Sequence, residues 1–365
     1  MDKTKSYLVT GCCGLVGYAV TEELLARGHH VIGIDNNNRK RYFNLAKDTY
    51  EEVLASLSNN WPERFLVLQS DISSKQCWED LSCFVADRNY DVVGIVHTAA
   101  QPSHDWATIN TMRDFEVNAI GTLRMLEWAR DHASQANIVY TSTNKVYGDR
   151  INNMEMTKEG DRFEPSILLA WRSGISEEFP VDDCLHSFFG CSKLVADLYC
   201  QEYGKHLGMN TIALRLGCIT GPMHRGAELH GFLSYLTKCA VTKKTYKIYG
   251  YDGYQVRDNI HADDLRDLIV PLVVSGWDYN YNGDVFNCGG GRVRSCSVRE
   301  AITHCEKYLG TEMDWISFPH QVRTGDHKWW ITDNSKLAEF APWWSQQYTL
   351  DKIFEDLLEH WNTAL

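Results

Sequence analysis

A glycine-rich stretch near the N-terminus constrains the fold of this chain more than any other feature. In Val9–Gly17, VTGCCGLVG, an apolar segment runs into glycines at positions 11, 14 and 17, and an amphipathic pattern follows from about Leu15 to Arg27. Only glycine lets a backbone turn this tightly and approach a phosphate to van der Waals contact. The amides at the start of the new helix then face that phosphate, where the helix dipole favours negative charge. The stretch therefore predicts a strand–loop–helix unit that binds the pyrophosphate of a dinucleotide.

An acidic residue at the end of the next strand supports this interpretation. The apolar segment His30–Ile34 ends at Asp35, 18 residues beyond Gly17, and dinucleotide-binding units carry an acid about 20 residues after their glycines. A carboxylate there accepts hydrogen bonds from both ribose hydroxyls and repels a 2′-phosphate, so NAD is favoured over NADP. Arg39 and Lys40 lie close by, which weakens this preference.

Composition and charge exclude several classes of function. The 365 residues are 44% hydrophobic, enough for one large domain or two ordinary ones of about 100–200 residues. The net charge of −12 argues against a nucleic-acid or anionic-membrane partner. The 12 cysteines show no zinc-type spacing, so we expect reduced thiols and no metal. Because no apolar run reaches about 18 residues and no signal peptide is seen, we expect a soluble, cytoplasmic protein.

Strand and helix patterns alternate along the first part of the chain. Apolar strand-like segments at Phe65–Leu68, Val92–Val96, Ile138–Tyr140 and Thr211–Arg215 are separated by helical patterns. This alternation predicts an α/β fold with a doubly wound parallel sheet of the Rossmann type, whose ligands lie beyond the carboxyl ends of the strands. We expect residues 1–215 to form the NAD-binding domain, with a segment near 255–290 returning to it. Residues 216–254 and 291–365 are expected to form a smaller, discontinuous substrate domain.

Five motifs resemble those of one enzyme superfamily. They are His97–Gln101, Asn118, Ser142–Asp149, Gly190–Lys193 and Val256–His261. Together with the GxxGxxG spacing they resemble the extended short-chain dehydrogenases/reductases from Val9 to about Asp333. The segments Ala99–Trp106 and Ser142–Asp149 are most similar to the CDP-tyvelose (CDP-paratose) 2-epimerase group.

The resemblance implies a set of binding residues. Those expected to contact NAD are Gly11, Gly14, Leu15, Val16, Gly17, Asp35, Asn36, Arg39, Asp71, Ile72, Ala99, Ala100, Gln101, Asn118, Thr141 and Lys193. Those expected to contact a nucleotide-diphosphate sugar are Ser103, His104, Thr143, Asn144, Lys145, Phe189, His224, Arg225, Arg257 and Arg323. Arginines suit the second task because their guanidinium forks match phosphate oxygens bidentately.

The catalytic motif departs from the pattern of the superfamily. Such enzymes use a Ser/Thr, a Tyr whose phenolate removes a hydroxyl proton, and a Lys that lowers the pKa of that Tyr. Thr143 and Lys193 match the first and last of these positions. The Tyr, four residues before the Lys, is replaced by Phe189, which has no ionisable proton.

Three explanations of Phe189 remain open. Another group acts as the base, the candidates being Lys193, His186, Cys191, Lys145 and Tyr147; or an original Tyr was exchanged to trap a complex; or the site binds without catalysing. Lys193 has a chemical argument, because an amine close to cationic NAD has a depressed pKa. The predicted catalytic set is Thr143, Lys193, His186 and Tyr147.

The expected activity is that of an isomerase. An epimerase of this kind oxidises a sugar carbon to a ketone and returns the hydride to the other face, so NAD is recycled; we expect this at C2 of a CDP-hexose. A dehydratase is disfavoured, because Asn144–Lys145 stands where dehydratases commonly carry an Asp–Glu pair. A net oxidoreductase and a non-catalytic NAD-binding protein are the remaining alternatives. The helices predicted at Asp114–His132 and Cys191–Leu207 match those that pair in many relatives, so a homodimer is expected.

Overall fold

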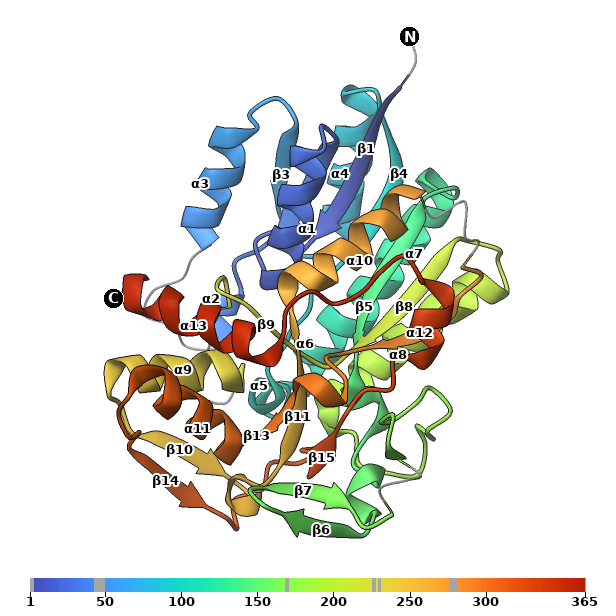
Figure 1. Cartoon of the computed structure of the whole chain (residues 1–365). Coiled ribbons are helices and arrows are strands. Elements are labelled where there is room, and N and C mark those ends of the chain that lie inside the picture. The colour runs from blue at the N-terminus through green and yellow to red at the C-terminus, as the bar shows by residue number, and fades with distance from the viewer. Residues whose placement is uncertain are drawn as a thin grey trace. The chain divides into compact units, whose positions relative to one another are not determined.

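A seven-stranded parallel sheet is the central element of the computed structural model (Figure 1). The structure describes residues 3–42, 50–167, 171–224, 228, 231–275 and 281–364. The strand order is β12–β8–β5–β4–β1–β2–β3. The strands are β1 (Thr4–Thr10), β2 (His30–Asp35), β3 (Phe65–Gln69), β4 (Tyr90–His97), β5 (Asn137–Thr143), β8 (Thr211–Leu216) and β12 (Asp284–Cys288). The chain winds outward from β1 in one direction and from β4 in the other, so the switch point lies between these two strands. The predicted doubly wound fold is confirmed.

Helices cover the sheet. They are α1 (Leu15–Ala26), α2 (Arg39–Tyr42), α3 (Tyr50–Asn60), α4 (Lys75–Asp87), α5 (His104–Ile109), α6 (Thr111–Phe115), the π-helical turn η1 (Glu116–Ile120), α7 (Gly121–His132), α8 (Ser187–Lys205) and α10 (Ala262–Ser275). Leu8 and Ile32 face a core that includes Trp78 of α4 and Trp128 of α7. On the opposite face, Val273 of α10 lies so close to Gly94 of β4 that a Cβ there would be 2.7 Å away. The alternation of side chains along each strand fills both cores.

The chain divides into two units. Unit 1 comprises Met1–Thr143, Phe188–Arg215 and Leu265–Val285, and unit 2 comprises Asn144–Ser187, Leu216–Asp264 and Phe286–Leu365. The division differs from the ranges expected from the sequence mainly at 144–187, a segment that those ranges place in the NAD-binding domain. This segment bonds within unit 2: His327 Nε2 donates to the Gly148 carbonyl at 2.8 Å, and the Lys328 amide donates to Asn152 Oδ1 at 2.7 Å.

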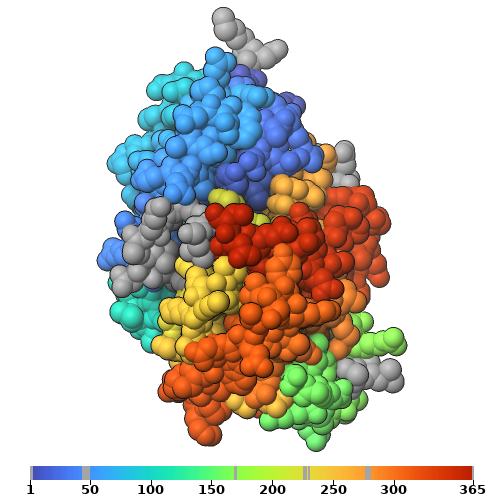
Figure 2. Space-filling model, turned by 60° about the vertical axis from the view of Figure 1, so that its left-hand side comes forward, coloured from blue at the N-terminus to red at the C-terminus, as the bar shows by residue number. Residues whose placement is uncertain are grey.

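Unit 2 combines short strands with helices, three of which pack together. Its strands are β6 (Met156–Glu159), β7 (Arg162–Pro165), β9 (Cys218–Thr220), β10 (Tyr246–Tyr249), β11 (Val256–His261), β13 (Ser295–Ser297), β14 (Trp315–Phe318) and β15 (Trp329–Trp330), and its helices are α9 (Phe232–Thr242), α11 (Val298–Leu309), α12 (Ser335–Phe340) and α13 (Leu350–Ala364). Short helical turns are η2 (Asn144–Tyr147), η3 (Arg150–Asn153), η5 (Tyr251–Gly253) and η7 (Arg292–Arg294). Helices α9, α11 and α13 share one apolar core, and they lie together on the face drawn in Figure 2.

Strand β11 is the central strand of unit 2. It pairs with β13, β15 and β9, and it carries Arg257 into the unit's interior. Across the described ranges, no helix has both the length and the apolar character needed to cross a membrane.

Candidate active site

The glycine loop in unit 1 is shaped for a phosphate group. Gly11 follows β1 with φ +71°, and a Cβ there would lie 2.8 Å from the backbone nitrogen of Ala99. A Cβ on Gly17 would lie 2.0 Å from the carbonyl oxygen of Gly11. Gly14 is the N-cap of α1 and supplies no capping side chain, so the first amides of the helix face the loop. Both close approaches require glycine, and the cradle fits a dinucleotide pyrophosphate.

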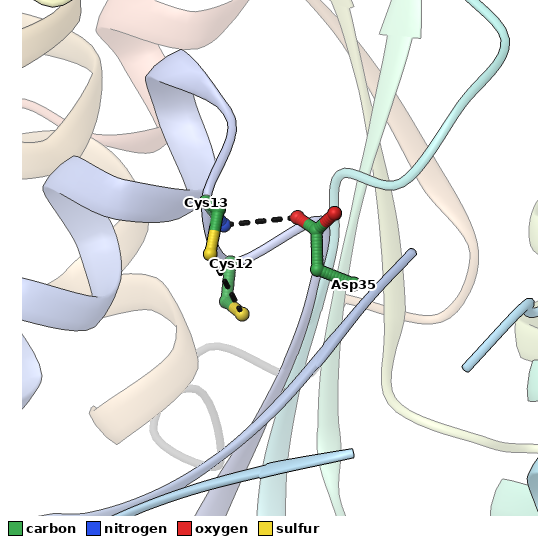
Figure 3. A group of neighbouring side chains, drawn as sticks. All are labelled: Cys12, Cys13 and Asp35. Atoms are coloured by element: carbon green, nitrogen blue, oxygen red, sulfur yellow. Dashed lines mark hydrogen bonds between the residues drawn. The ribbon is translucent and has the colours of Figure 1, made fainter. Parts of the chain in front are cut away.

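The carboxylate of Asp35 is held at the edge of this loop (Figure 3). It accepts hydrogen bonds from the Cys13 amide at 3.0 Å and from the Asn37 amide at 3.1 Å. These two bonds fix the Asp35 carboxylate beside the loop, and its contact with the ribose of NAD stays a prediction.

Two thiols lie beside Asp35, and together the three side chains bring possible metal-ligand atoms within 4.8 Å of one another. Cys12 Sγ is 3.9 Å from Cys13 Sγ (Figure 3). The contact with Cys13 and burial raise the pKa of the Cys12 thiol well above its ordinary value.

A second acid, Asp71, lies in a network after β3. Asn36 Nδ2 donates to Asp71 Oδ2 at 3.1 Å, Ser73 donates to Oδ1, and Arg113 of α6 forms an ion pair with the same carboxylate. Burial alone would raise the pKa of Asp71, but the Ser73 hydrogen bonds and Arg113 hold it below its ordinary value. Arg113 was missed from the sequence, because no motif surrounds it and its partner lies 42 residues away.

A buried hydrogen-bond network joins the end of β4 to α8. The Gln101 amide donates to Asn118 Oδ1 at 2.8 Å, and Asn118 Nδ2 donates to Ser192 Oγ at 3.0 Å. Ser192 Oγ in turn donates to the carbonyl of Phe189 at 3.0 Å. Asn118 lies in the π-helical turn η1, a local geometry frequent at functional sites. Asn118, predicted to contact NAD, therefore also positions the segment that follows β4, and Ser192 is a partner that sequence reasoning missed.

Lys193 projects from α8 to the carboxyl end of β5. Its Nζ donates to the Thr141 carbonyl at 2.8 Å and lies 4.4 Å from the ring centre of Tyr140. The side chain is buried, and burial lowers the pKa of Lys193 to about 7, although Asp197 and Asp114 oppose this change. An amine with this pKa is partly neutral at physiological pH. Thr143, the last residue of β5, is two positions beyond the carbonyl that Lys193 contacts.

Asp197, one turn after Lys193 on α8, forms several buried hydrogen bonds and an ion pair. Asp197 accepts from Ser142 Oγ at 2.5 Å and from Gln201 Nε2 at 2.7 Å, and it forms a buried ion pair with Arg215 at 2.9 Å. Sequence reasoning missed this cluster, since its members come from three separate elements. It fixes α8 against β5 and β8, and so fixes the position of Lys193.

Phe189 occupies the place where the superfamily motif has tyrosine. Its ring is buried and contacts the His104 imidazole, with ring centres 4.5 Å apart and planes tilted by 51°. His104 is the first residue of α5, and Ser103 caps that helix by accepting from the Trp106 amide. Unit 1 thus brings together Thr143, Lys193, Phe189 and His104 of the predicted site.

A group of cations surrounds one acid in unit 2. Arg257 NH2 is 2.5 Å from Asp326 Oδ1, and Lys145 Nζ is 3.6 Å from the same oxygen. Burial is the main cause that lowers the pKa of Lys145 to about 8, and the positive charges of Arg257 and Arg323 add to this shift. The negative charge of Asp326 acts in the opposite direction. Burial would raise the pKa of Asp326, but Arg257 and Lys145 hold it well below its ordinary value. Three cations predicted to bind the nucleotide sugar, Lys145, Arg257 and Arg323, therefore lie in one cluster, and Asp326 is a member that sequence reasoning missed.

Other predicted residues of unit 2 have mainly structural contacts. The Tyr147 hydroxyl is fully buried and donates to Asn287 Oδ1 at 2.8 Å, a geometry that favours a packing role over proton transfer. The ring nitrogens of His186 lie 3.8 and 4.0 Å from Cys184 Sγ. His224 is buried in the loop after β9. Arg225 lies outside the described residues.

Comparisons with known proteins agree with this geometry. The sequence matches the NAD dependent epimerase/dehydratase family over residues 7–289. It is 31% identical over 341 residues to a CDP-paratose 2-epimerase from Salmonella typhi, covering 92% of this chain and 93% of that protein. It is 24% identical over 357 residues to a dTDP-glucose 4,6-dehydratase from Shigella flexneri, covering 93% and 88%.

A solved structure shares the fold over the whole chain. The UDP-glucuronic acid 4-epimerase from Bacillus cereus, solved in complex with UDP-glucuronic acid and NAD, superposes with a TM-score of 0.77 at 24% identity. The match covers 99% of this chain and 100% of that one. The relatives thus include both epimerases and a dehydratase, and NAD is common to the family and to the solved neighbour.

Proposed function

Because the chain belongs to the NAD-dependent epimerase/dehydratase family, we propose that it is a nucleotide-sugar epimerase that acts through a transient ketosugar at C2 of a CDP-hexose. The choice of position and nucleotide is supported by the CDP-paratose 2-epimerase relative, at 31% identity over nearly the full length of both proteins. The observation that carries the chemistry is Lys193, a buried amine with a pKa of about 7 at the carboxyl end of β5.

The cofactor would be held by the loop glycines, Asp35 and Lys193. When bound, NAD takes a hydrogen with its electron pair from the sugar carbon and later gives it back. The glycine loop and α1 bind its pyrophosphate, and Asp35 orients a ribose.

The protein side chains do the remaining work. The Thr143 hydroxyl donates a hydrogen bond to the reacting sugar oxygen, and Lys193 holds positive charge near that oxygen. The substrate diphosphate binds the cations of unit 2, where Arg257 and Lys145 already hold the carboxylate of Asp326. Arginine and lysine at such distances suit phosphate oxygens equally well.

A dehydratase remains the second candidate, because a dTDP-glucose 4,6-dehydratase is among the relatives. Loss of water requires an acid that protonates the leaving hydroxyl. The residues after Thr143 are Asn144 and Lys145, and neither is a carboxylic acid. This sequence favours epimerisation.

Product analysis tests the proposal. The purified protein is incubated with CDP-, UDP- and GDP-hexoses, and the sugars are followed by NMR while NADH absorbance is recorded. We expect one CDP-hexose to give its C2 epimer with no net NADH. A 4-keto-6-deoxy product would assign a dehydratase, NADH accumulation a net oxidoreductase, and no turnover of any sugar a binding protein whose site lost its tyrosine.

We also propose that the protein acts as a homodimer. Apolar side chains remain exposed on two helices of unit 1: Met112 at 68% and Phe115 at 40% on α6, and Leu198 at 46% and Tyr199 at 45% on α8. Large apolar groups that are exposed in the monomer favour burial in a partner interface. Light scattering should give the dimer mass, and Leu198→Glu should shift it toward the monomer; a wild-type monomer at high concentration would refute this proposal.

A further inference from the structure

Because Phe189 stands in place of the tyrosine, another group must accept the proton of the sugar hydroxyl. Phe189 keeps an aromatic ring in place but has no group that accepts a proton. The described imidazole that contacts this ring is that of His104, with ring centres 4.5 Å apart. Histidine is the side chain best suited to move protons near neutral pH, because its ordinary pKa is about 6.5.

Buried hydrogen bonds link the segments that carry the two rings. On one side, Ser192 Oγ donates to the Phe189 carbonyl and accepts from Asn118 Nδ2. On the other side, Asn118 Oδ1 accepts from the Gln101 amide, and Gln101 Nε2 donates to the Ser103 carbonyl at 2.9 Å. Ser103 directly precedes His104. The chain of hydrogen bonds therefore runs from the Phe189 carbonyl of α8 to the Ser103 carbonyl, which belongs to the residue that precedes α5.

Further hydrogen bonds restrain the segment from Gln101 to Ser103. The Ser103 amide donates to Gln101 Oε1 at 2.5 Å, and Gln101 Nε2 also donates to Asp114 Oδ1 at 2.7 Å. These residues are all buried. The backbone that carries His104 is therefore restrained, and a well-defined position of the base is what acid–base catalysis requires.

We propose that His104 is the proton acceptor of this enzyme and takes the role of the missing phenol. The inference rests on the epimerase function proposed above. In the oxidation, the sugar O–H bond breaks and its proton moves to an imidazole nitrogen, while the hydrogen on carbon leaves with its electron pair to NAD, so that a C=O bond forms. In the return step the imidazolium gives the proton back to oxygen as the hydride returns to carbon, and nothing is consumed.

Three of the other candidates for the base are less well placed. Tyr147 is fully buried with its hydroxyl donating to Asn287. The Nζ of Lys193 donates to a backbone carbonyl, which suits a positioning and electrostatic role beside the base. Cys191 is exposed on α8.

Substitution of His104 provides the activity test. His104→Ala and the more conservative His104→Gln should each lower kcat by about 10²–10⁴-fold, the usual contribution of general acid–base catalysis, and leave KM within a few-fold. The control is His206→Ala, an exposed residue at the end of the α8 segment in the same unit. Added imidazole should restore part of the activity of His104→Ala, and the double variant His104→Ala with Phe189→Tyr should recover activity relative to His104→Ala alone.

A measurement independent of turnover completes the test. In holoenzyme with ¹³C-labelled histidine, the ring signal of His104, assigned by its loss in His104→Gln, should shift on binding of the nucleotide sugar that is turned over, and the His206 signal should not. Unchanged kcat in both His104 variants, or a His104 signal that ignores the sugar, would overturn the inference while the epimerase function stands. Absence of turnover by the wild-type protein would overturn both.

Discussion

Replacing Lys193 by methionine should make the protein more stable at neutral pH, although it removes a residue of the proposed active site. Lys193 is buried, and its ammonium form is desolvated there. Methionine fills a similar volume without a charge. The expected increase in the free energy of unfolding therefore measures how much the buried ammonium group destabilises the folded protein.

The magnitude follows from the pKa. Burial lowers the pKa of Lys193 from 10.5 to about 7, which corresponds to about 5 kcal/mol in favour of the unfolded chain when both states are protonated. Loss of the hydrogen bond to the Thr141 carbonyl costs about 1–3 kcal/mol. We expect Lys193→Met to stabilise the cofactor-free protein by about 2–4 kcal/mol at pH 6.

The effect should depend on pH in one direction. Between pH 7 and 10.5 the unfolded lysine binds a proton that the folded one has released, so wild-type stability rises with pH in this window. The difference in free energy of unfolding between Lys193→Met and the wild type should therefore decrease as pH rises and reach about zero near pH 9.5.

Urea unfolding followed by circular dichroism at pH 6, 7.5 and 9.5 checks this expectation. The control is Lys75→Met, since Lys75 is 78% exposed on α4 and forms a surface ion pair with Glu79. This substitution should change the free energy of unfolding by less than about 0.5 kcal/mol at every pH. A Lys193→Met protein that is less stable than wild type by the same amount at all three pH values would refute the reasoning.

Three further predictions follow from the binding elements. Gly17→Ala places a Cβ 2.0 Å from the Gly11 carbonyl oxygen and should abolish NAD binding in calorimetry while the protein stays folded by circular dichroism; retained affinity would contradict the close packing. Asp35→Asn should weaken NAD binding by about 10–100-fold and reduce the ratio of the affinity for NAD to that for NADP, because it removes a charged acceptor. An unchanged ratio of the two affinities would argue against a contact between Asp35 and the ribose. Arg257→Met should raise KM for the nucleotide sugar by about 10–100-fold with kcat nearly unchanged, and an unchanged KM would exclude the cluster around Asp326 as the diphosphate site.

Local patterns in the sequence predicted the architecture well. The glycine spacing, the strand that precedes it and Asp35 are close along the chain, and the structure joins them as expected through the Cys13 amide. Strand–helix alternation likewise predicted the parallel sheet, because each βα unit forms from contiguous residues.

Contacts between distant segments could not be predicted in this way. Arg113 pairs with Asp71, and Ser142 and Arg215 meet at Asp197, yet no short spacing links these residues. The segment 144–187 has no periodic pattern, so its hydrogen bonds with residues 326–328 had no signal in the sequence. The contact between His104 and Phe189 belongs to the same class, since the two motifs that carry these residues are 85 positions apart.

Hydrogen retention at the epimerised carbon tests the proposed function most directly. The protein is incubated in D₂O with the CDP-hexose that it converts, and both epimers are analysed by NMR and mass spectrometry. A hydride that leaves and returns on a bound cofactor predicts that the product keeps its carbon-bound hydrogen and that no NADH accumulates. Deuterium at the epimerised carbon, or a product that has lost water, would contradict an epimerase that works through a transient ketosugar.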